Sequence, residues 1–425
     1  MTSAESTIEK VNKNLARRYR AEQRFRLYGI LSVLFGLSCL VVLFTDIIGK
    51  GYKGFVSTEI YLTVDLSSDD LGISDPEVEN AFMQADFEGA IKRALYARLD
   101  VTDRRAKRAL NALISSGASY ALRDQVKRQP ELLDSSHGFW LLADDDVDTW
   151  YKSVDSKSPF TGRLSDEQLT WLQTLDFSGE LRTALNTTFF TSGDSREPEM
   201  AGIMGAALGS FFTVLVTLLL SFPIGVAAAV YLEEYAPKNR WTDLIEVNIN
   251  NLAAVPSIIF GLLGLAIFIN FFEMPRSIPL VGGLVLTLMT LPTIIISSRA
   301  AIKAVPPSIR EAALGLGASK MQMVMHHVLP LAMPGMLTGA IIGMAQALGE
   351  TAPLLMIGMV AFVVDLPGGV MDAATALPVQ IFLWADSPER AFVEKTSAAI
   401  MVLLGFLFLM NALAVWLRRR LERRW

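Results

Sequence analysis

The sequence predicts an all-α polytopic membrane protein with six transmembrane helices and an inserted α+β domain. Hydrophobic residues make up 52% of the 425 residues and charged residues only 19%, which is more apolar than a typical soluble protein. The apolar residues gather into stretches that each reach the roughly 20 residues needed to cross a bilayer as a helix. The six stretches are Leu27 to Gly49, Gly202 to Leu232, Leu244 to Phe272, Leu280 to Ile302, Met336 to Val363 and Val393 to Leu417.

Basic residues flank these stretches unevenly. Seven lysines and arginines precede the first stretch, whereas only Lys50 and Lys53 follow it closely. Cationic flanks remain in the cytoplasm, so residues 1–26 are predicted to be a cytoplasmic N-terminus and residues 27–49 a retained membrane anchor. Six crossings return the chain to the cytoplasm, where residues 418–425 form a basic tail with five arginines.

Residues 50–199 are predicted to form an extracytoplasmic α+β domain. Alternating apolar residues predict a strand over Phe55 to Leu66. Helical patterns follow at Pro76 to Leu99, Thr102 to Gln129 and Ser165 to Thr174. The single cysteine, Cys39, excludes a disulfide within the chain.

An acidic run in this domain allows two interpretations. Asp144, Asp145, Asp146 and Asp148 offer oxygen ligands for a metal, but the run lacks the glycine and the distal glutamate of an EF-hand loop. A solvated turn is the favoured interpretation. The acidic balance would repel a free anion, so this domain is not expected to bind one.

A polar island at residues 308–330 separates the fourth and fifth stretches. Glu311 to Leu316 is a run of good helix formers, Gly317 permits a turn, and Met321 to Leu329 resumes a helix. The island is therefore predicted to be two short helices joined at a glycine outside the bilayer. An ordinary solvated loop is the alternative, but three methionines expected to face outward, Met321, Met323 and Met325, favour contact with a partner.

Two ionisable residues within the apolar stretches are candidates for function. Glu350, followed by Thr351, is expected about 14 residues into the fifth stretch, either lining a path or gate, or holding helices together. Arg299 follows several hydroxyl residues of the fourth stretch and suits either an oxyanion path or simple snorkelling to the surface. Whether Arg299 pairs with Glu350 stays open.

The sequence contains no pattern typical of an enzyme active site. The spacing of a nucleotide-binding P-loop is absent, and the adjacent His326 and His327 cannot share one helix face as metal ligands. The chain is therefore not expected to be an enzyme or to hold a cofactor or a metal. Small-residue stripes, such as Gly335, Gly339 and Gly343, predict close helix packing instead.

Several segments together resemble the phosphate ABC importer permeases, most closely those of the PstA type. The island from Arg310 resembles their EAA loop, and the other segments are A-L-G-E-T-A-P-L-L from Ala347, V-P-S-I-I-F-G-L-L-G-L from Val255 and L-P-V-Q-I-F-L-W from Leu377. The resemblance covers roughly residues 186–425. The segment Phe189 to Glu199 and the domain before it resemble the N-terminal extension of a long-form subset.

The resemblance implies a type I ABC importer permease core of the MetI-like kind at residues 200–417, in a bacterial inner membrane, importing inorganic phosphate by alternating access. The implied partners are a cytoplasmic ABC ATPase dimer that hydrolyses ATP, a PstC-like second permease, a periplasmic phosphate-binding protein and membrane lipid, with no nucleic acid. Carried onto this sequence, the residues implied for ATPase coupling are Glu311, Ala312, Ala313 and Gly317. Those implied for the translocation path are Arg299, Arg310, Glu350 and Thr351.

Two other functions fit parts of the sequence. A permease for another oxyanion, such as molybdate or sulfate, would keep the same loop. A membrane sensor that signals through the loop would need no ATPase partner.

Overall fold

The computed structural model describes residues 7–73, 81–156 and 162–421, and the chain divides into two compact units, Met1–Lys50 and Gly51–Trp425. Helix α1 (Thr7–Gly54) forms the described part of the first unit. Its apolar part is exposed within the chain and is long and apolar enough to cross a membrane. This agrees with the predicted first span.

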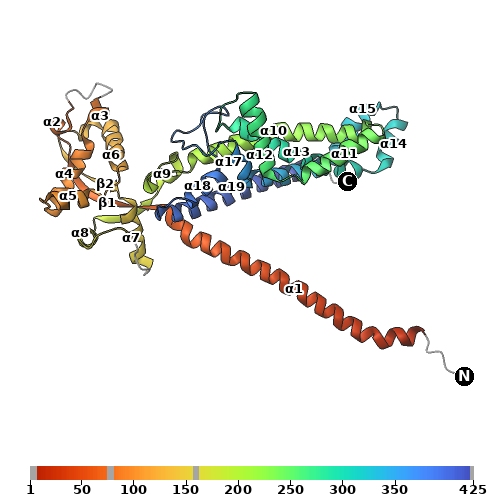
Figure 1. The fold of residues 1–425 in the computed structure, drawn as a ribbon, viewed down its shortest axis with the longest axis horizontal. Helices are drawn as coiled ribbons and strands as arrows, with labels where there is room; N and C mark the ends of the chain where they lie inside the picture. The colour runs from red at the N-terminus through yellow and green to blue at the C-terminus, as the bar shows by residue number, and fades with distance from the viewer. Residues whose placement is uncertain (1–6, 74–80, 157–161, 422–425) are drawn as a thin grey trace. The chain divides into compact units, whose positions relative to one another are not determined.

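A three-stranded antiparallel sheet forms the centre of the α+β domain, residues 56–185 (Figure 1). The strand order is β2 (Ser136–Leu142), β1 (Val56–Asp65) and β3 (Leu181–Leu185). Ile60, Leu62 and Val64 of β1 are all at most 2% exposed. The alternation that predicted this strand therefore reports its buried face correctly.

Short helices surround the sheet. They are α2 (Ser68–Leu71), α3 (Ala81–Gln84), α4 (Phe87–Leu99), α5 (Arg104–Asn111), α6 (Gly117–Arg128), the 3-10 turn η1 (Pro130–Leu132), α7 (Asp145–Ser156) and α8 (Asp166–Phe177). The predicted helix from Thr102 is in fact two helices, because Ile114 between them forms a β-bridge with Ala143. The predicted helix from Pro76 begins outside the described residues and is interrupted before α4, where the Asp86 carboxylate accepts a hydrogen bond from the Gly89 N–H.

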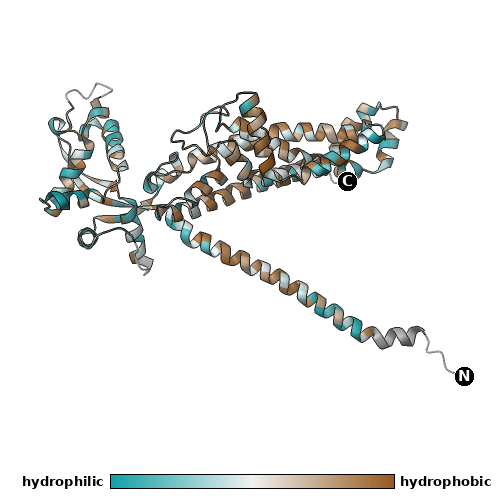
Figure 2. Ribbon diagram, in the orientation of Figure 1, coloured by the Kyte–Doolittle hydropathy of each residue, from teal (hydrophilic) through white to brown (hydrophobic). Residues whose placement is uncertain are grey.

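Long apolar helices make up the rest of the second unit (Figure 2). After α9 (Thr187–Thr191) and the 3-10 turn η2 (Pro198–Met200) come α10 (Met204–Val230), α11 (Arg240–Ala253), α12 (Ser257–Gly264), α13 (Pro279–Lys303), α16 (Leu329–Gly349), α17 (Ala352–Met356), α18 (Leu377–Ala385) and α19 (Ala391–Leu421). Helix α10 continues as a π-helical turn η3 (Tyr231–Tyr235), and α12 continues as η4 (Leu265–Phe271). Across the described residues, five helices could cross a membrane, or six if α11 and α12 count as one bent span.

The third predicted span, Leu244 to Phe272, is not a straight helix. Helices α11 and α12 meet at an angle of 101° at residues 254–256. Pro256 lacks a backbone donor and disfavours helical geometry in the residue before it, which accounts for the break. Helix α10 ends near Arg310, whereas the start of α13 bonds to Val370. The bent pair therefore connects the two ends of the bundle.

Glycines allow the helices to approach closely. A Cβ on Gly283 of α13 would lie 2.5 Å from Val216 of α10, and one on Gly335 of α16 would lie 2.6 Å from the Ala301 Cβ. At Gly339 the Ser297 hydroxyl occupies the corresponding space. The predicted packing role of the small-residue stripe is confirmed at Gly335 and Gly339, whereas a Cβ on Gly343 would make only ordinary contacts.

Candidate functional site

The predicted polar island forms an elbow at one end of the helix bundle, opposite the end near α9 and α18 (Figure 1). We use "elbow" for residues 307–328. It consists of α14 (Pro307–Gly315), α15 (Lys320–Met323) and a π-helical turn η5 (Val324–Val328) that leads into α16. Ser319 and Gln322 form a capping box at the start of α15. Gly317 between the helices has a φ of 85°, which only glycine adopts readily.

The elbow has an outer face and a face anchored in the protein. Glu311 and Ala312 are exposed, whereas Ala313 is only 5% exposed and packs in a cluster with Ile302 and Val328. Large apolar side chains on the outer face are Leu314, Leu316, Met321 and Met325. Met323 was expected to face outward with the other methionines, but it is buried in the same cluster as Ala313. The exposed apolar set is a surface that suits a protein partner.

Arg310 connects the elbow to two other helices. Its Nε donates to Glu234 Oε1 at 3.0 Å, Nη1 donates to the Val305 carbonyl at 2.6 Å and Nη2 donates to the Ile302 carbonyl at 2.8 Å. The Ile302 carbonyl belongs to the last turn of α13, where backbone acceptors lack the usual helical partners, and Val305 lies two residues beyond the end of that helix. The guanidinium thus holds α14 against the ends of both α10 and α13.

Arg299 of α13 pairs with two glutamates rather than with Glu350. Its Nε lies 2.5 Å from Glu233 Oε1, and its Nη2 lies 2.6 Å from Glu246 Oε1. The arginine side chain is 11% exposed. Burial of Arg299 and Glu233 explains their pairing, because an isolated charge inside a protein is strongly disfavoured, whereas Glu246 is 36% exposed. Glu233 and Glu234 were not predicted to be functional from the sequence, although two acidic residues at the end of an apolar span are a visible signal.

Glu350 and Thr351 lie at a break between two helices. Helix α16 begins at Leu329 and ends at Gly349, so the bounds expected for the fifth span, Met336 to Val363, are wrong. Glu350 adopts an extended conformation at the end of α16, and α17 starts two residues later with Pro353 in its first turn. Both residues are half-buried.

The helix that follows the break at Glu350 packs against the helix that follows the break at Pro256. Helix α12 contacts α17 so closely that a Cβ on Gly261 would lie 2.6 Å from the Pro353 Cα. Gly264, one turn further, lies against Val285 and Ile357. The structure thus brings together two of the segments that carried the family resemblance. Paired breaks in membrane helices free backbone groups and are a common setting for transport sites.

A second polar cluster joins the α+β domain to the start of α19. We call Asp148, Lys152, Glu394 and Lys395 the junction cluster. Lys152 Nζ lies 2.5 Å from Asp148 Oδ2, 3.5 Å from Glu394 Oε2 and 2.8 Å from the Val56 carbonyl oxygen. The Lys395 ammonium donates to the Ala201 carbonyl at 3.2 Å. This cluster could not be predicted from the sequence, because its members come from segments far apart in the chain.

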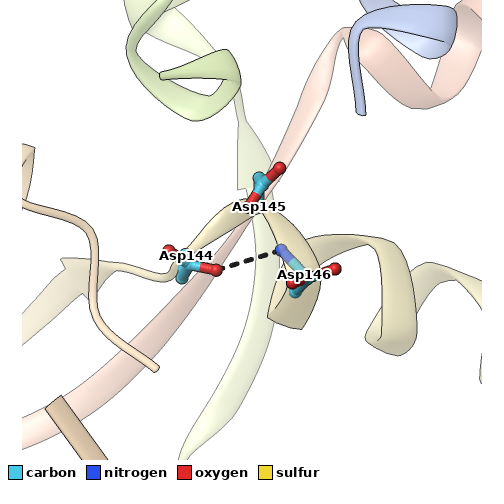
Figure 3. Close-up of side chains that lie close together, drawn as sticks. All are labelled: Asp144, Asp145 and Asp146. Carbon is cyan, nitrogen blue, oxygen red and sulfur yellow. Dashed lines mark hydrogen bonds between the residues drawn. The ribbon is translucent and has the colours of Figure 1, made fainter. Parts of the chain in front are cut away.

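The acidic run near this junction is the start of helix α7 rather than a solvated turn (Figure 3). The Asp146 N–H donates to Asp144 Oδ1 at 3.2 Å, and one oxygen from each of Asp144, Asp145 and Asp146 lies within 4.8 Å of the others. Burial, followed by repulsion from Asp145, raises the pKa of Asp144. The raised pKa means that Asp144 keeps its proton to a higher pH than an exposed aspartate does.

Glu199 provides a prediction about pH. Burial raises its pKa from 4.5 to about 7, although the Ser115 hydroxyl donates a hydrogen bond to it at 2.6 Å. The folded state holds this proton more tightly than the unfolded chain does. The resulting stabilisation, at most about 3 kcal/mol, is complete below pH 4.5 and is lost as the pH rises through about 7.

We therefore expect the melting temperature of the Glu199→Gln variant to fall less between pH 5 and 8 than that of the wild type. Both are measured on the full chain in detergent. Glu197→Gln, at an exposed position two residues earlier, is the control and should leave the slope unchanged. Identical slopes for wild type and Glu199→Gln would contradict the prediction.

Comparison with known proteins identifies the family. Residues 221–425 match the family described as "Binding-protein-dependent transport system inner membrane component", and residues 12–159 match a "Domain of unknown function (DUF3333)". The chain is 36% identical over 171 residues to the probable ABC transporter permease protein YqgI of Bacillus subtilis, a match that covers 40% of this chain and 58% of that protein.

A second relative is matched over more of its length. The chain is 31% identical over 228 residues to the phosphate transport system permease protein PstA of Haemophilus influenzae, covering 54% of this chain and 79% of that protein. Among solved structures, an inward-facing MetNI methionine ABC transporter matches 51% of this chain and 95% of its own, with a TM-score of 0.40 and 21% identity. The chain belongs to the binding-protein-dependent transport system inner membrane components, as a PstA-type permease of an ABC importer.

Proposed function

We propose that this chain is the permease subunit of an ATP-driven importer that moves inorganic phosphate into the cell. The observation that carries the proposal is the 31% identity to a phosphate transport system permease over 79% of that protein's length. The packing of Gly261 against Pro353 supports it, because the two segments that resemble phosphate permeases form one contact in space.

The proposed orientation places the elbow and both termini in the cytoplasm and the α+β domain in the periplasm. The arginines before Leu27 and those after Leu417 support this. Arg423 and Arg424 belong to this basic tail but lie outside the described residues, as do residues 1–6 of the N-terminus.

The elbow is proposed to dock a cytoplasmic ABC ATPase dimer. Glu311 and Ala312, together with the exposed Leu316 and Met321, would contact the ATPase. Ala313 and Gly317 would act indirectly, the first by anchoring α14 and the second by setting the angle to α15. ATP-driven closure of the dimer would move the elbow and alternate access to the path. A PstC-like second permease and a periplasmic phosphate-binding protein complete the proposed complex in the lipid membrane.

Glu350 and Thr351 are proposed to line the translocation path at the break between α16 and α17. Half-burial and a non-helical backbone leave polar groups available there. Arg299 and Arg310 remain predicted residues of the translocation path. An anion at either arginine would compete with the carboxylates that already bind it.

Phosphate uptake in cells lacking this chain tests the proposal. Radiolabelled phosphate at micromolar concentration is expected to enter only when the wild-type chain is restored, and an ATPase subunit is expected to co-purify with it. Parallel assays with sulfate and molybdate cover the other oxyanions. Restored uptake of one of these ions instead of phosphate would contradict the assignment of phosphate as the substrate. A chain that purifies without an ATPase would favour the function of a membrane sensor.

A further inference from the structure

Two consecutive glutamates at the end of α10 bind arginines from different parts of the protein. Glu233 pairs with Arg299 of α13, whereas Glu234 pairs with Arg310 of the elbow at 2.9 Å. Both glutamates lie on the π-helical turn Tyr231–Tyr235. Neighbouring residues of a helical turn point in different directions, so one short turn can serve two partners.

The charges in these two pairs are shielded from water. The side chains of Glu234 and Glu233 are 8% and 12% exposed, and those of Arg299 and Arg310 are 11% and 21% exposed. Charges at such sites are weakly screened, and removal of one partner leaves the other uncompensated. By contrast, Lys303, which lies 3.3 Å from Glu233, is 62% exposed.

The same turn also contacts the second arm of the elbow. The Tyr235 hydroxyl lies 3.5 Å from the Met321 sulfur, and the Lys320 ammonium lies 5.0 Å from the centre of the Tyr235 ring. The turn therefore contacts α14 through Glu234 and α15 through Tyr235. Because Arg310 also binds the Ile302 carbonyl of α13 and the Val305 carbonyl just beyond it, α14 cannot tilt without displacing α10 and α13 or breaking these hydrogen bonds.

We propose that the turn Tyr231–Tyr235 is a joint that transmits movement of the elbow to α10 and α13. Glu234 and Arg310 are positioning residues in this joint, and they couple ATP hydrolysis to solute movement. The Glu233–Arg299 pair holds α10 and α13 together so that they move as one body, and Glu246 adds α11 to that body. The inference rests on the proposed docking of an ATPase at the elbow.

The test uses the complete complex in proteoliposomes, with ATP hydrolysis and phosphate uptake measured in the same preparation. Glu234→Gln keeps an oxygen that can accept from Arg310 but removes the charge. Arg310→Lys keeps the charge but cannot bind the carboxylate and both carbonyls at once. In both variants we expect the ATPase to remain bound and active, while phosphate moved per ATP falls at least about tenfold, as expected for loss of a shielded ion pair. Lys303→Gln is the matched control and should keep the wild-type ratio.

Any of three results would contradict the proposed role of the joint. These are an unchanged ratio of phosphate moved to ATP hydrolysed in both variants, loss of the ATPase from the complex, or less folded protein with that ratio preserved. Failure of the proposed function is separately visible, because the wild-type complex would then move no phosphate. In that case the number of ions moved per ATP is measured with the ion that the wild-type complex does move, sulfate or molybdate. The same variants then test the role of the joint with that ion.

Discussion

Replacing Gly317 by valine is expected to reduce solute uptake by at least about tenfold while the chain still reaches the membrane. Gly317 has a φ of 85° and no atom within 4 Å of the position that a Cβ would occupy. The free-energy cost of a side chain there therefore comes from the backbone conformation and not from contact with neighbouring atoms. It is about 1–2 kcal/mol for an ordinary residue and larger for a β-branched one. The chain would relieve it by changing the angle between α14 and α15, which displaces the exposed apolar side chains of the elbow.

Two controls separate this effect from simple loss of a glycine. Gly317→Asn should retain most uptake, because asparagine adopts the left-handed conformation more readily than other residues with side chains. Gly315→Ala should be neutral, since Gly315 lies in α14 with no atom within 4 Å of its added Cβ and alanine favours a helix. The measurement is uptake normalised to the amount of chain in the membrane, together with ATPase co-purification. Full uptake by Gly317→Val would show that the elbow angle is not required.

The elements predicted well from the sequence are those determined by local physics. The buried face of β1 follows from alternation, and the turn at Gly317 follows from the conformations open to glycine alone. Span lengths follow from hydropathy, which is why α10 and α13 lie close to their predicted positions. The third and fifth spans were misjudged because hydropathy continues through Pro256 and Gly349, whereas the backbone does not.

The partners of charged residues could not be predicted in this way. Arg299 was recognised as important from its position in an apolar span, but its two carboxylate partners come from α10 and α11. Lys152 and Glu394 lie 242 residues apart in the chain. Sequence shows that a buried charge needs a partner, but only the packing of the helices determines which one it finds.

Replacing Lys152 by methionine is expected to lower the melting temperature of the purified chain by roughly 10 °C. The Lys152 side chain is 5% exposed and lies between the carboxylates of Asp148 and Glu394. Asp148 also accepts hydrogen bonds from the Thr58 N–H and hydroxyl, at 2.7 and 2.8 Å, so it cannot turn away to another partner. Methionine fills a similar volume but removes the cation that pairs directly with both carboxylates, and breaking a buried pair costs about 3–5 kcal/mol.

The matched control is Lys92→Met. Lys92 pairs with Glu88, which lies four residues earlier in the chain, just as Lys152 pairs with Asp148, but the Lys92–Glu88 pair is 38% and 67% exposed. Exposed pairs contribute only about 0.2–1 kcal/mol, so its melting temperature should change little. Because the junction cluster connects β1 and α7 to the start of α19, limited proteolysis of Lys152→Met should also release the α+β domain faster than in the control. Equal melting temperatures and cleavage rates for the two variants would mean that apolar packing around Phe189, Trp384 and Phe392, rather than the junction cluster, holds the domain in place.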